Sequence, residues 1–308
     1  MTAEQITILT TTSSFGTGAP AATLRFVANP WGRKLKEAEL ASLLEEHRPA
    51  GLLAGTEPIS RAILTAAKDY LRVISRVGAG WDNVDHDAAA ELGMRVYRTS
   101  GVLTQAVAEL TLGLMLAALR SITLQDRMLR QGTWQKRMGG LLQGKTVGII
   151  GFGAIGQRVG ELVRAFDAKM VFYDPHPMEV GWGKGVSLKE LLEQADLITL
   201  HASGKQKILG AEELSWIGSR GVILINTARG DMIDEEALAA SLHAGQIGCA
   251  CLDVFGEEPY RGSLCSMDNL ILTPHIGSYA REARQLMEET AIDNLMQGLR
   301  EAGVLRNH

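Results

Sequence analysis

Two patterns of hydrophobic and polar positions alternate along the chain. Short runs of apolar and β-branched residues recur, and between them lie longer stretches in which apolar positions repeat every three or four residues. The short runs predict buried strands, and the longer stretches predict amphipathic helices. In the first part of the chain we expect strands at 6–11, 24–27, 51–54, 73–76 and 96–98, and helices at 35–46, 59–68 and 86–92.

A second series of the same kind follows a long apolar helix expected at 103–119. A polar, Arg-rich stretch reaching residue 143 lies between the two series and is interpreted as a linker. Strands are then expected at 146–150, 170–173, 197–200, 222–226, 250–254 and 270–273. A last helix, expected at about 281–300, has no strand after it and should pack back onto the first domain. This alternation predicts an α/β fold with two doubly wound parallel-sheet domains.

Composition and charge exclude several classes of protein. The chain has 308 residues, of which 46% are hydrophobic and 21% charged, and its formal net charge is -4. These values are typical of a globular chain of about two domains. A slightly acidic chain without a basic patch predicts no nucleic-acid partner.

The length of the apolar runs and the number of cysteines indicate where in the cell the protein is expected. The longest apolar stretch, 110–119, is shorter than the ~20 residues that span a bilayer, so no membrane partner is expected. The three cysteines provide neither a disulfide framework nor a zinc cluster. We therefore expect a cytoplasmic protein without a metal site. These cysteines are Cys249, Cys251 and Cys265.

A glycine-rich turn directly follows the strand expected at 146–150 and begins a helix. It reads Gly151-Phe152-Gly153-Ala154-Ile155-Gly156. The first glycine permits the tight turn, the second lets the backbone approach a pyrophosphate, and the third permits close contact between helix and strand. Asp174 stands eighteen residues after Gly156, at the end of the next strand. A carboxylate there binds the adenosine ribose hydroxyls and repels a 2′-phosphate, so the sequence predicts NAD(H) as cofactor in preference to NADP(H).

Four further segments occur around this turn in a characteristic order. They are SRVGAGWDNVD at 75–85, NTARG at 226–230, LDVFGEEP at 252–259 and TPHIG at 273–277. Together with the glycine turn, the chain resembles the D-2-hydroxyacid dehydrogenase family, and within it the phosphoglycerate dehydrogenase-like members. The resemblance implies a Rossmann NAD-binding domain, residues 100–281, inserted into a flavodoxin-like substrate-binding domain formed by 1–99 and 282–308. It also implies a homodimer, with the contact formed by the helix at 103–119 and the stretch after it.

The implied reaction interconverts a small D-2-hydroxy acid and its 2-keto acid, and it needs a proton donor and acceptor. His275 has the intrinsic acidity for that role near neutral pH. Glu258 is expected to hold the other ring nitrogen and to favour the protonated ring. Arg229 is expected to bind the substrate carboxylate and polarise the carbonyl. Taken singly, each has a plainer interpretation as a turn or surface residue, but their joint order favours the catalytic one.

The remaining candidate residues would hold the cofactor or the substrate. Asp253 is expected to accept the N–H of the nicotinamide carboxamide. The main-chain N–H groups of Ala79 and Gly80 are expected to bind the substrate carboxylate. His201, at the end of the strand at 197–200, is expected to be structural or to support the site from outside. By resemblance, the other cofactor-binding residues are Ala154, Ile155, Thr227, Ala228 and Gly277.

Substrate identity and the direction of the reaction stay open at this point. Phosphoglycerate dehydrogenases place an arginine in the loop corresponding to 55–58, whereas this chain has no basic residue there and carries Glu57. A carboxylate near a doubly charged phosphate is unfavourable, so phosphoglycerate is not the default substrate. A second hypothesis is an NAD(H)-sensing dimeric regulator, similar to the corepressors of this family, with little turnover.

Overall fold

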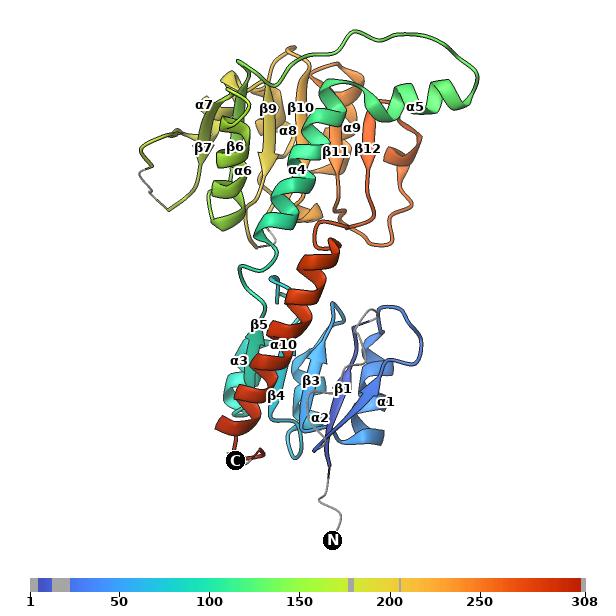
Figure 1. Cartoon of the computed structure of the whole chain (residues 1–308), viewed down its shortest axis with the longest axis vertical. Coiled ribbons are helices and arrows are strands. Elements are labelled where there is room, and N and C mark those ends of the chain that lie inside the picture. The colour runs from blue at the N-terminus through green and yellow to red at the C-terminus, as the bar shows by residue number, and fades with distance from the viewer. Residues whose placement is uncertain (1–4, 13–22, 177–179, 205, 306–308) are drawn as a thin grey trace. The chain divides into compact units, whose positions relative to one another are not determined.

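The chain folds as two compact units. The computed structural model describes residues 5–12, 23–176, 180–204 and 206–305. One unit consists of Met1–Leu103 together with Arg281–His308, and the other of Thr104–Ala280. The second unit is thus inserted into the first, and in Figure 1 the red helix at 281–301 belongs to the same unit as the blue strands of the N-terminal part.

The first unit contains a five-stranded parallel sheet with the order β2-β1-β3-β4-β5. This is the flavodoxin order 2-1-3-4-5, so the fold expected for this part is confirmed. Three helices cover one face through the apolar side chains of their inner sides, and a fourth covers the other. The strands are β1 (Ile6–Thr10), β2 (Leu24–Ala28), β3 (Gly51–Ala54), β4 (Val73–Arg76) and β5 (Arg95–Arg98). The helices are α1 (Glu37–His47), α2 (Arg61–Ala67), α3 (His86–Glu91) and, on the opposite face, α10 (Arg281–Glu301).

The second unit contains a seven-stranded parallel sheet with the order β12-β11-β10-β9-β6-β7-β8. Its strands are β6 (Thr146–Ile150), β7 (Lys169–Tyr173), β8 (Lys184–Gly185), β9 (Leu197–Leu200), β10 (Val222–Asn226), β11 (Ile247–Leu252) and β12 (Leu270–Leu272). The sequence predicted six strands. The seventh, β8, is two exposed residues long at the sheet edge and has no apolar run to reveal it.

Helices cover both faces of this second sheet, as an all-parallel sheet requires. One layer is formed by α4 (Thr104–Leu119) and α6 (Ala154–Arg164), and the opposite layer by α7 (Leu188–Gln194), α8 (Ala211–Ser215) and α9 (Glu235–His243). Two short 3₁₀ turns, Gly230–Met232 and Ser263–Ser266, follow β10 and precede β12. The strand order reverses between β9 and β6, and in doubly wound sheets the crevice at such a point holds the ligand.

The Arg-rich stretch interpreted as a linker contains a helix, α5 (Ile122–Arg130), that the sequence analysis did not predict. The segment is rich in leucine, glutamine, methionine and arginine, which are good helix formers, and Arg130 pairs with Asp126 at 2.8 Å along the helix. No residue of α5 is buried. In Figure 1, α5 and the segment after it extend outward from the body of their unit.

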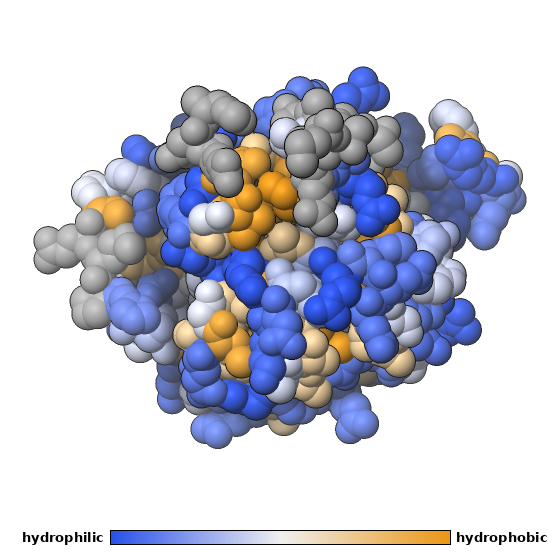
Figure 2. Space-filling view, turned by 90° about the horizontal axis from the view of Figure 1, so that it is seen from below, coloured by the Kyte–Doolittle hydropathy of each residue, from blue (hydrophilic) through white to orange (hydrophobic). Residues whose placement is uncertain are grey.

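Apolar residues elsewhere are mostly buried between sheets and helices. On the face drawn in Figure 2, hydrophilic residues cover most of the surface, and hydrophobic ones show in small separate groups. Among the described residues, no single helix is long and apolar enough to cross a bilayer. The pair α4 and α5, bent by 61° at their junction, meets that criterion only by combined length and composition.

Candidate active site

Most of the candidate residues lie at one edge of the seven-stranded sheet, beyond the carboxyl ends of its strands. Because parallel strands all end at the same edge, the sheet order also orders these residues in space. From β12 across to β7, the residues that follow successive strands are His275, Asp253, Arg229, His201, Gly151 and Asp174. Along this edge, the candidate acid/base His275 is therefore followed by the candidate cation Arg229, then by the glycine turn and by Asp174, the candidate ribose ligand.

The glycine turn has the geometry that a dinucleotide phosphate needs. Gly151 has φ 87°, and a Cβ on it would lie 2.4 Å from the main-chain N of Ala202. A Cβ on Gly156 would lie 2.2 Å from the Gly151 carbonyl oxygen, so helix α6 packs directly on the turn. Around Gly153, which precedes the first residue of α6, no atom lies within 4 Å of the Cβ position. The N-terminus of α6 is thus open to an anion, and the turn fits a pyrophosphate.

Asp174 lies beside this turn, at the end of β7. Its Oδ2 accepts a hydrogen bond from the N–H of Phe152 at 2.7 Å, and its Oδ1 accepts from the N–H of His176 at 2.9 Å. These two bonds hold the carboxylate next to the glycine turn. Each oxygen keeps a lone pair for a ribose hydroxyl.

His275 and Glu258 come together across the loops that flank β12. His275 Nδ1 lies 2.9 Å from Glu258 Oε2 and 3.1 Å from Oε1. Both side chains are partly exposed, at 46% for His275 and 37% for Glu258. His275 adopts the left-handed conformation, with φ 54°, which is uncommon outside glycine. With Nδ1 held by the carboxylate, Nε2 is the nitrogen available for proton transfer.

Asp253 organises the segment that carries His275. Its carboxylate is buried, with the residue 1% exposed, and it accepts three hydrogen bonds: from the Thr273 hydroxyl at 2.6 Å, from the N–H of Ile276 at 2.8 Å and from the N–H of Gly277 at 2.8 Å. The sequence analysis assigned Asp253 only to the nicotinamide carboxamide. The structure shows that it also ties together the turn around His275, which leaves one lone pair for a further donor.

Arg229 is placed by a residue that the sequence analysis did not single out. Asn226, the last residue of β10, is 1% exposed. Its Nδ2 donates to the Arg229 carbonyl at 2.8 Å, and its Oδ1 accepts from the N–H of Ala228 at 3.0 Å. Thr227 is held separately, by a 3.0 Å contact between its hydroxyl and that of Thr111 on α4. Asn226 could have been identified from the sequence, because a polar asparagine ends a central apolar strand there and belongs to the NTARG motif.

Because Gly230 has no side chain, the turn that contains Arg229 packs closely on the loop that leads to Glu258. A Cβ on Gly230 would lie 1.9 Å from the Phe255 carbonyl carbon and 2.3 Å from the Gly256 N, both of them main-chain atoms. This contact excludes any side chain at position 230. It packs the turn after β10 directly on the turn after β11, so the segments that carry Arg229 and Glu258 are in contact.

We expect Gly230→Ala to destabilise the chain by about 1–3 kcal/mol, because backbone must shift to admit the methyl group. Gly256→Ala is the matched control, since its nearest contact would be the Glu235 side chain at 3.6 Å. Urea unfolding of both variants measures the difference. Equal stabilities would contradict the close packing of these two turns.

Ala79 and Gly80 belong to the other unit, in the loop after β4. Among the described hydrogen bonds, none uses the N–H of either residue as donor. The Ala79 carbonyl accepts from Arg98 at 3.3 Å, and the Arg98 guanidinium lies over the Trp81 ring, 4.3 Å from its centroid. Arg98 therefore holds this loop through a carbonyl and an aromatic ring. The N–H groups of Ala79 and Gly80 are left as two donors for an anion.

The loop at 55–58 in the same unit is held by its own carboxylate. Glu57 is 1% exposed and accepts hydrogen bonds from the Thr11 hydroxyl and from the N–H of Gly55. Asn83 Nδ2 donates to the carbonyls of Gly55 and Glu57, at 3.2 and 2.7 Å. Glu57 therefore joins the ends of β1 and β3 and does not project into solvent.

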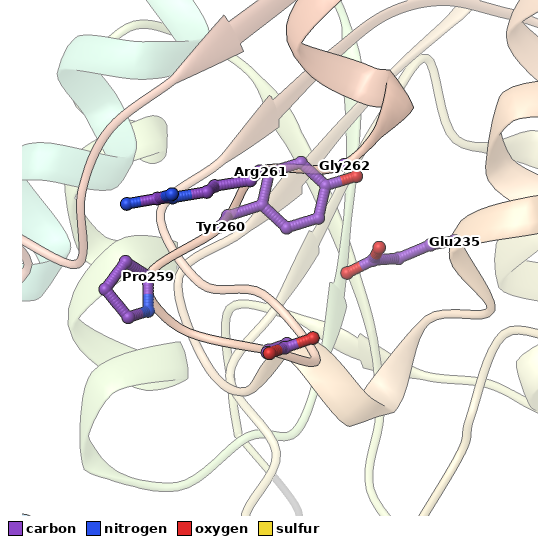
Figure 3. Close-up of a pocket in the computed structure, with 6 residues that line it drawn as sticks. Glu235, Pro259, Tyr260, Arg261 and Gly262 are labelled. Carbon is purple, nitrogen blue, oxygen red and sulfur yellow. The ribbon is translucent and has the colours of Figure 1, made fainter.

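A separate cavity of about 340 Å³ lies beside the segment after Glu258 (Figure 3). Glu235 of α9 lines it from one side, and the chain from Pro259 to Gly262 lines it from the other. Neither His275 nor Arg229 lines this cavity, so it is distinct from the acid/base pair. Among the described side chains, no group of three or more His, Cys, Asp or Glu is arranged to hold a metal ion.

Comparison with protein families gives an independent result. Residues 112–277 match the family described as D-isomer specific 2-hydroxyacid dehydrogenase, NAD binding domain. The chain is 40% identical over 272 residues to the D-3-phosphoglycerate dehydrogenase of Methanocaldococcus jannaschii, an alignment that covers 84% of this chain and 51% of that protein. The chain thus spans about half the length of that relative. It is 37% identical to the hydroxypyruvate reductase of Thermotoga maritima, over 86% of this chain and 89% of that enzyme.

Solved structures agree with the sequence comparison. The TT0316 protein of Thermus thermophilus matches with a TM-score of 0.88 and 35% identity, over 96% of this chain and 97% of that one. An acyclic imino acid reductase solved in complex with NADPH and D-Arg matches with a TM-score of 0.85 and 25% identity, over 96% of this chain and 98% of that one. The same architecture therefore occurs in a protein that binds NADPH.

Proposed function

Because the chain belongs to the D-isomer specific 2-hydroxyacid dehydrogenase family and is an NAD(H)-dependent oxidoreductase, we propose that it reduces a small 2-keto acid with His275 as the proton donor. The observation that carries this assignment is the pairing of His275 Nδ1 with the Glu258 carboxylate at 2.9 Å. In this proposal Thr104–Ala280 is the cofactor-binding unit, and the other unit binds the substrate.

In the proposed reaction, each residue acts on one part of the substrate. The bound cofactor supplies a hydride to C2 of the keto acid. His275 delivers a proton from Nε2 to the carbonyl oxygen as that oxygen becomes negative, and Glu258 stabilises the protonated ring and fixes its orientation. Arg229 binds the carboxylate and polarises the carbonyl. The N–H groups of Ala79 and Gly80 bind the same carboxylate.

The substrate is proposed to be a small monoanionic 2-keto acid of the glyoxylate or hydroxypyruvate type. The loop at 55–58 offers no cation to a phosphate, and its Glu57 is already committed to Thr11 and Gly55. The name of the Thermotoga maritima relative, hydroxypyruvate reductase, is consistent with this class. Phosphohydroxypyruvate belongs in any test panel, because another relative is named D-3-phosphoglycerate dehydrogenase.

NADH is proposed to be preferred over NADPH because of Asp174. A 2′-phosphate at the ribose would face a carboxylate that Phe152 and His176 already hold in place. We expect Asp174→Asn to lower the ratio of kcat/KM for NADH over NADPH by about 10- to 100-fold, since one like-charge repulsion at close range is removed. Steady-state assays with both cofactors measure the ratio. An unchanged ratio would contradict the assignment.

A homodimer is proposed through the segment from α5 to residue 141. This segment exposes five large hydrophobic side chains, and such a concentration is typical of an interaction surface. The residues are Ile122 (53% exposed), Leu129 (55%), Trp134 (82%), Met138 (98%) and Leu141 (65%). We expect the double variant Trp134→Ser, Met138→Ser to sediment as a monomer and the wild type as a dimer. A monomeric wild type would contradict the proposal.

The regulatory alternative is not favoured, because the named relatives are dehydrogenases and reductases. The experiment that separates the two functions measures NADH binding and keto-acid turnover on the same preparation. An enzyme binds NADH and oxidises it with at least one keto acid, whereas a sensor binds NADH and oxidises it with none. We propose a cytoplasmic location, which is consistent with the three cysteines being free thiols.

A further inference from the structure

The loop after β4, which contains Ala79 and Gly80, is held by the end of the neighbouring strand β5. Thr99, the residue directly after β5, donates its N–H to the Gly78 carbonyl at 3.2 Å. Arg98, the last residue of β5, donates from Nη1 of its guanidinium to the Ala79 carbonyl at 3.3 Å. Two successive carbonyls of the loop are therefore bonded to two successive residues of one strand end.

The geometry of the peptide bond connects these carbonyls to the free donors of the loop. In a planar trans peptide, the C=O and the N–H point in opposite directions. The Gly78 carbonyl shares a peptide with the N–H of Ala79, and the Ala79 carbonyl shares one with the N–H of Gly80. Each N–H therefore points away from the group that holds the carbonyl of its peptide. Among the described residues neither N–H is itself a donor, so the carbonyl contacts are the hydrogen bonds that orient these two peptides.

The two carbonyl contacts differ in kind. The N–H of Thr99 is a main-chain donor, which almost any residue would supply. The donor from Arg98 belongs to a side chain with a full positive charge, and a hydrogen bond to a charged group is stronger than a neutral one. A cation on a carbonyl also polarises the peptide and strengthens its N–H as a donor. The N–H of Gly80 should therefore be the better of the two anion donors.

The position of the guanidinium is fixed although the Arg98 side chain is exposed. The guanidinium lies over the Trp81 ring, 4.3 Å from its centroid, an attractive arrangement for a cation. Trp81 is in turn held by His86: their ring centroids lie 4.4 Å apart, and His86 Nε2 lies 3.1 Å from the Trp81 carbonyl oxygen. The main chain of Arg98 is held by Asn294 of α10, whose Nδ2 donates to its carbonyl at 3.2 Å. Both ends of the residue are thus anchored within one unit.

We propose that Arg98 is a positioning residue for the substrate. By holding the Ala79 carbonyl, it directs the N–H of Gly80 toward the carboxylate of the keto acid and strengthens that N–H as a donor. The inference rests on the proposed function, in which Ala79 and Gly80 bind this carboxylate. Because the carboxylate takes no part in the bond changes, it is bound alike before and in the transition state. Loss of the contribution from Arg98 should therefore raise KM and leave kcat unchanged.

Substitutions of Arg98 test this role through the split between KM and kcat. We expect Arg98→Gln, which removes the charge, to raise KM for the keto acid by about 5- to 20-fold with kcat within about twofold of wild type. Arg98→Lys keeps a cation near the carbonyl and should recover KM to within about threefold. The matched control is Arg95→Gln, because Arg95 begins β5 at its other end and pairs with Glu301 at 3.0 Å. This control removes the same charge and should leave KM within about twofold.

The assays use the full chain at saturating NADH, with glyoxylate or hydroxypyruvate, whichever the wild type reduces faster. NADH titrations and thermal melts confirm that each variant binds cofactor and is folded. An unchanged KM in Arg98→Gln would overturn the inference. So would a fall in kcat or in NADH affinity as large as the rise in KM, since that would indicate a general loss of structure. A KM in Arg98→Lys as high as in Arg98→Gln would overturn the role of the charge.

The amide resonance of Gly80 separates positioning from direct contact with the substrate. Labelling alanine carbonyls with ¹³C and glycine amides with ¹⁵N selects the Ala–Gly peptides, and the signal lost in Gly80→Ala identifies the one in this loop. We expect Arg98→Gln to shift the ¹⁵N resonance of Gly80 without substrate, and Arg95→Gln to leave it in place. A raised KM with an unshifted resonance would mean that Arg98 contacts the substrate itself, and would overturn the positioning role. A wild type that reduces no keto acid would contradict the proposed function, whereas the resonance would still test the contact of Arg98 with this peptide.

Discussion

His275→Gln is expected to lower kcat for keto-acid reduction by about 10²- to 10⁴-fold, the usual contribution of a positioned general acid. Glutamine retains similar size and polarity but cannot deliver a proton to the carbonyl oxygen as the hydride arrives. NADH affinity should stay within about twofold of wild type, because His275 follows β12 and the glycine turn follows β6, on the far side of the intervening strands. Stopped-flow measurement of a single turnover gives the chemical step, and fluorescence titration gives the affinity.

The matched control for this variant is His243→Gln. His243 ends α9, where its Nδ1 lies 2.7 Å from the Ala239 carbonyl of the same helix, so kcat should stay within about twofold of wild type. The assignment of His275 would be contradicted by a single-turnover rate close to that of wild type. A loss of rate accompanied by an equal loss of NADH affinity would instead indicate a collapsed site.

Arg229→Lys is expected to lower kcat/KM for the keto acid by about 10²- to 10³-fold, comparable to the loss of a donor that stabilises developing negative charge. Lysine keeps the positive charge but not the planar pair of N–H donors that fits a carboxylate. Asn226 holds the backbone of this turn through main-chain atoms of Ala228 and Arg229, so the turn should keep its conformation in the variant. Steady-state kinetics with the preferred keto acid measure the change.

Arg61→Lys serves as the control for a conservative change of an arginine. Arg61 lies on α2 and pairs at the surface with Glu91, and exposed pairs contribute little to stability. Its kcat/KM should match that of wild type. If Arg229→Lys also matched wild type, Arg229 would not be the group that binds the substrate carboxylate.

The alternation of apolar runs and amphipathic stretches was enough to predict the fold class. Parallel strands buried on both faces read as continuous apolar runs, so β6, β9 and β10 were visible in the sequence. Two elements, β8 and α5, were not predicted from the sequence, and the reason is physical. The exposed β8 has no apolar run, and α5 buries no side chain, so neither was marked by a buried hydrophobic pattern. The strand expected at 250–254 lies at Ile247–Leu252, where Leu252 pairs with Asn226 of β10 and with Leu272 of β12, the last residues of those strands.

The sequence also predicted the residue types of the candidate site, because motif order places them at the ends of successive strands. It did not predict how those residues are held. The burial of Glu57 and the hydrogen bonds of Asn226 to the Arg229 turn depend on how the loops fold. The same holds for Asp253, whose three donors all come from a segment some twenty residues further along the chain. Such contacts leave no periodic trace in the sequence.

We propose that this chain reduces a 2-keto acid with NADH to give the D-hydroxy acid. The most direct measurement follows NADH oxidation by the wild type with glyoxylate, pyruvate, hydroxypyruvate and phosphohydroxypyruvate. Chiral chromatography then identifies the products that have a stereocentre. We expect turnover with at least one non-phosphorylated keto acid, at a kcat/KM above that for phosphohydroxypyruvate, and a product of D configuration. Tight NADH binding without turnover of any keto acid, or a product of L configuration, would contradict it.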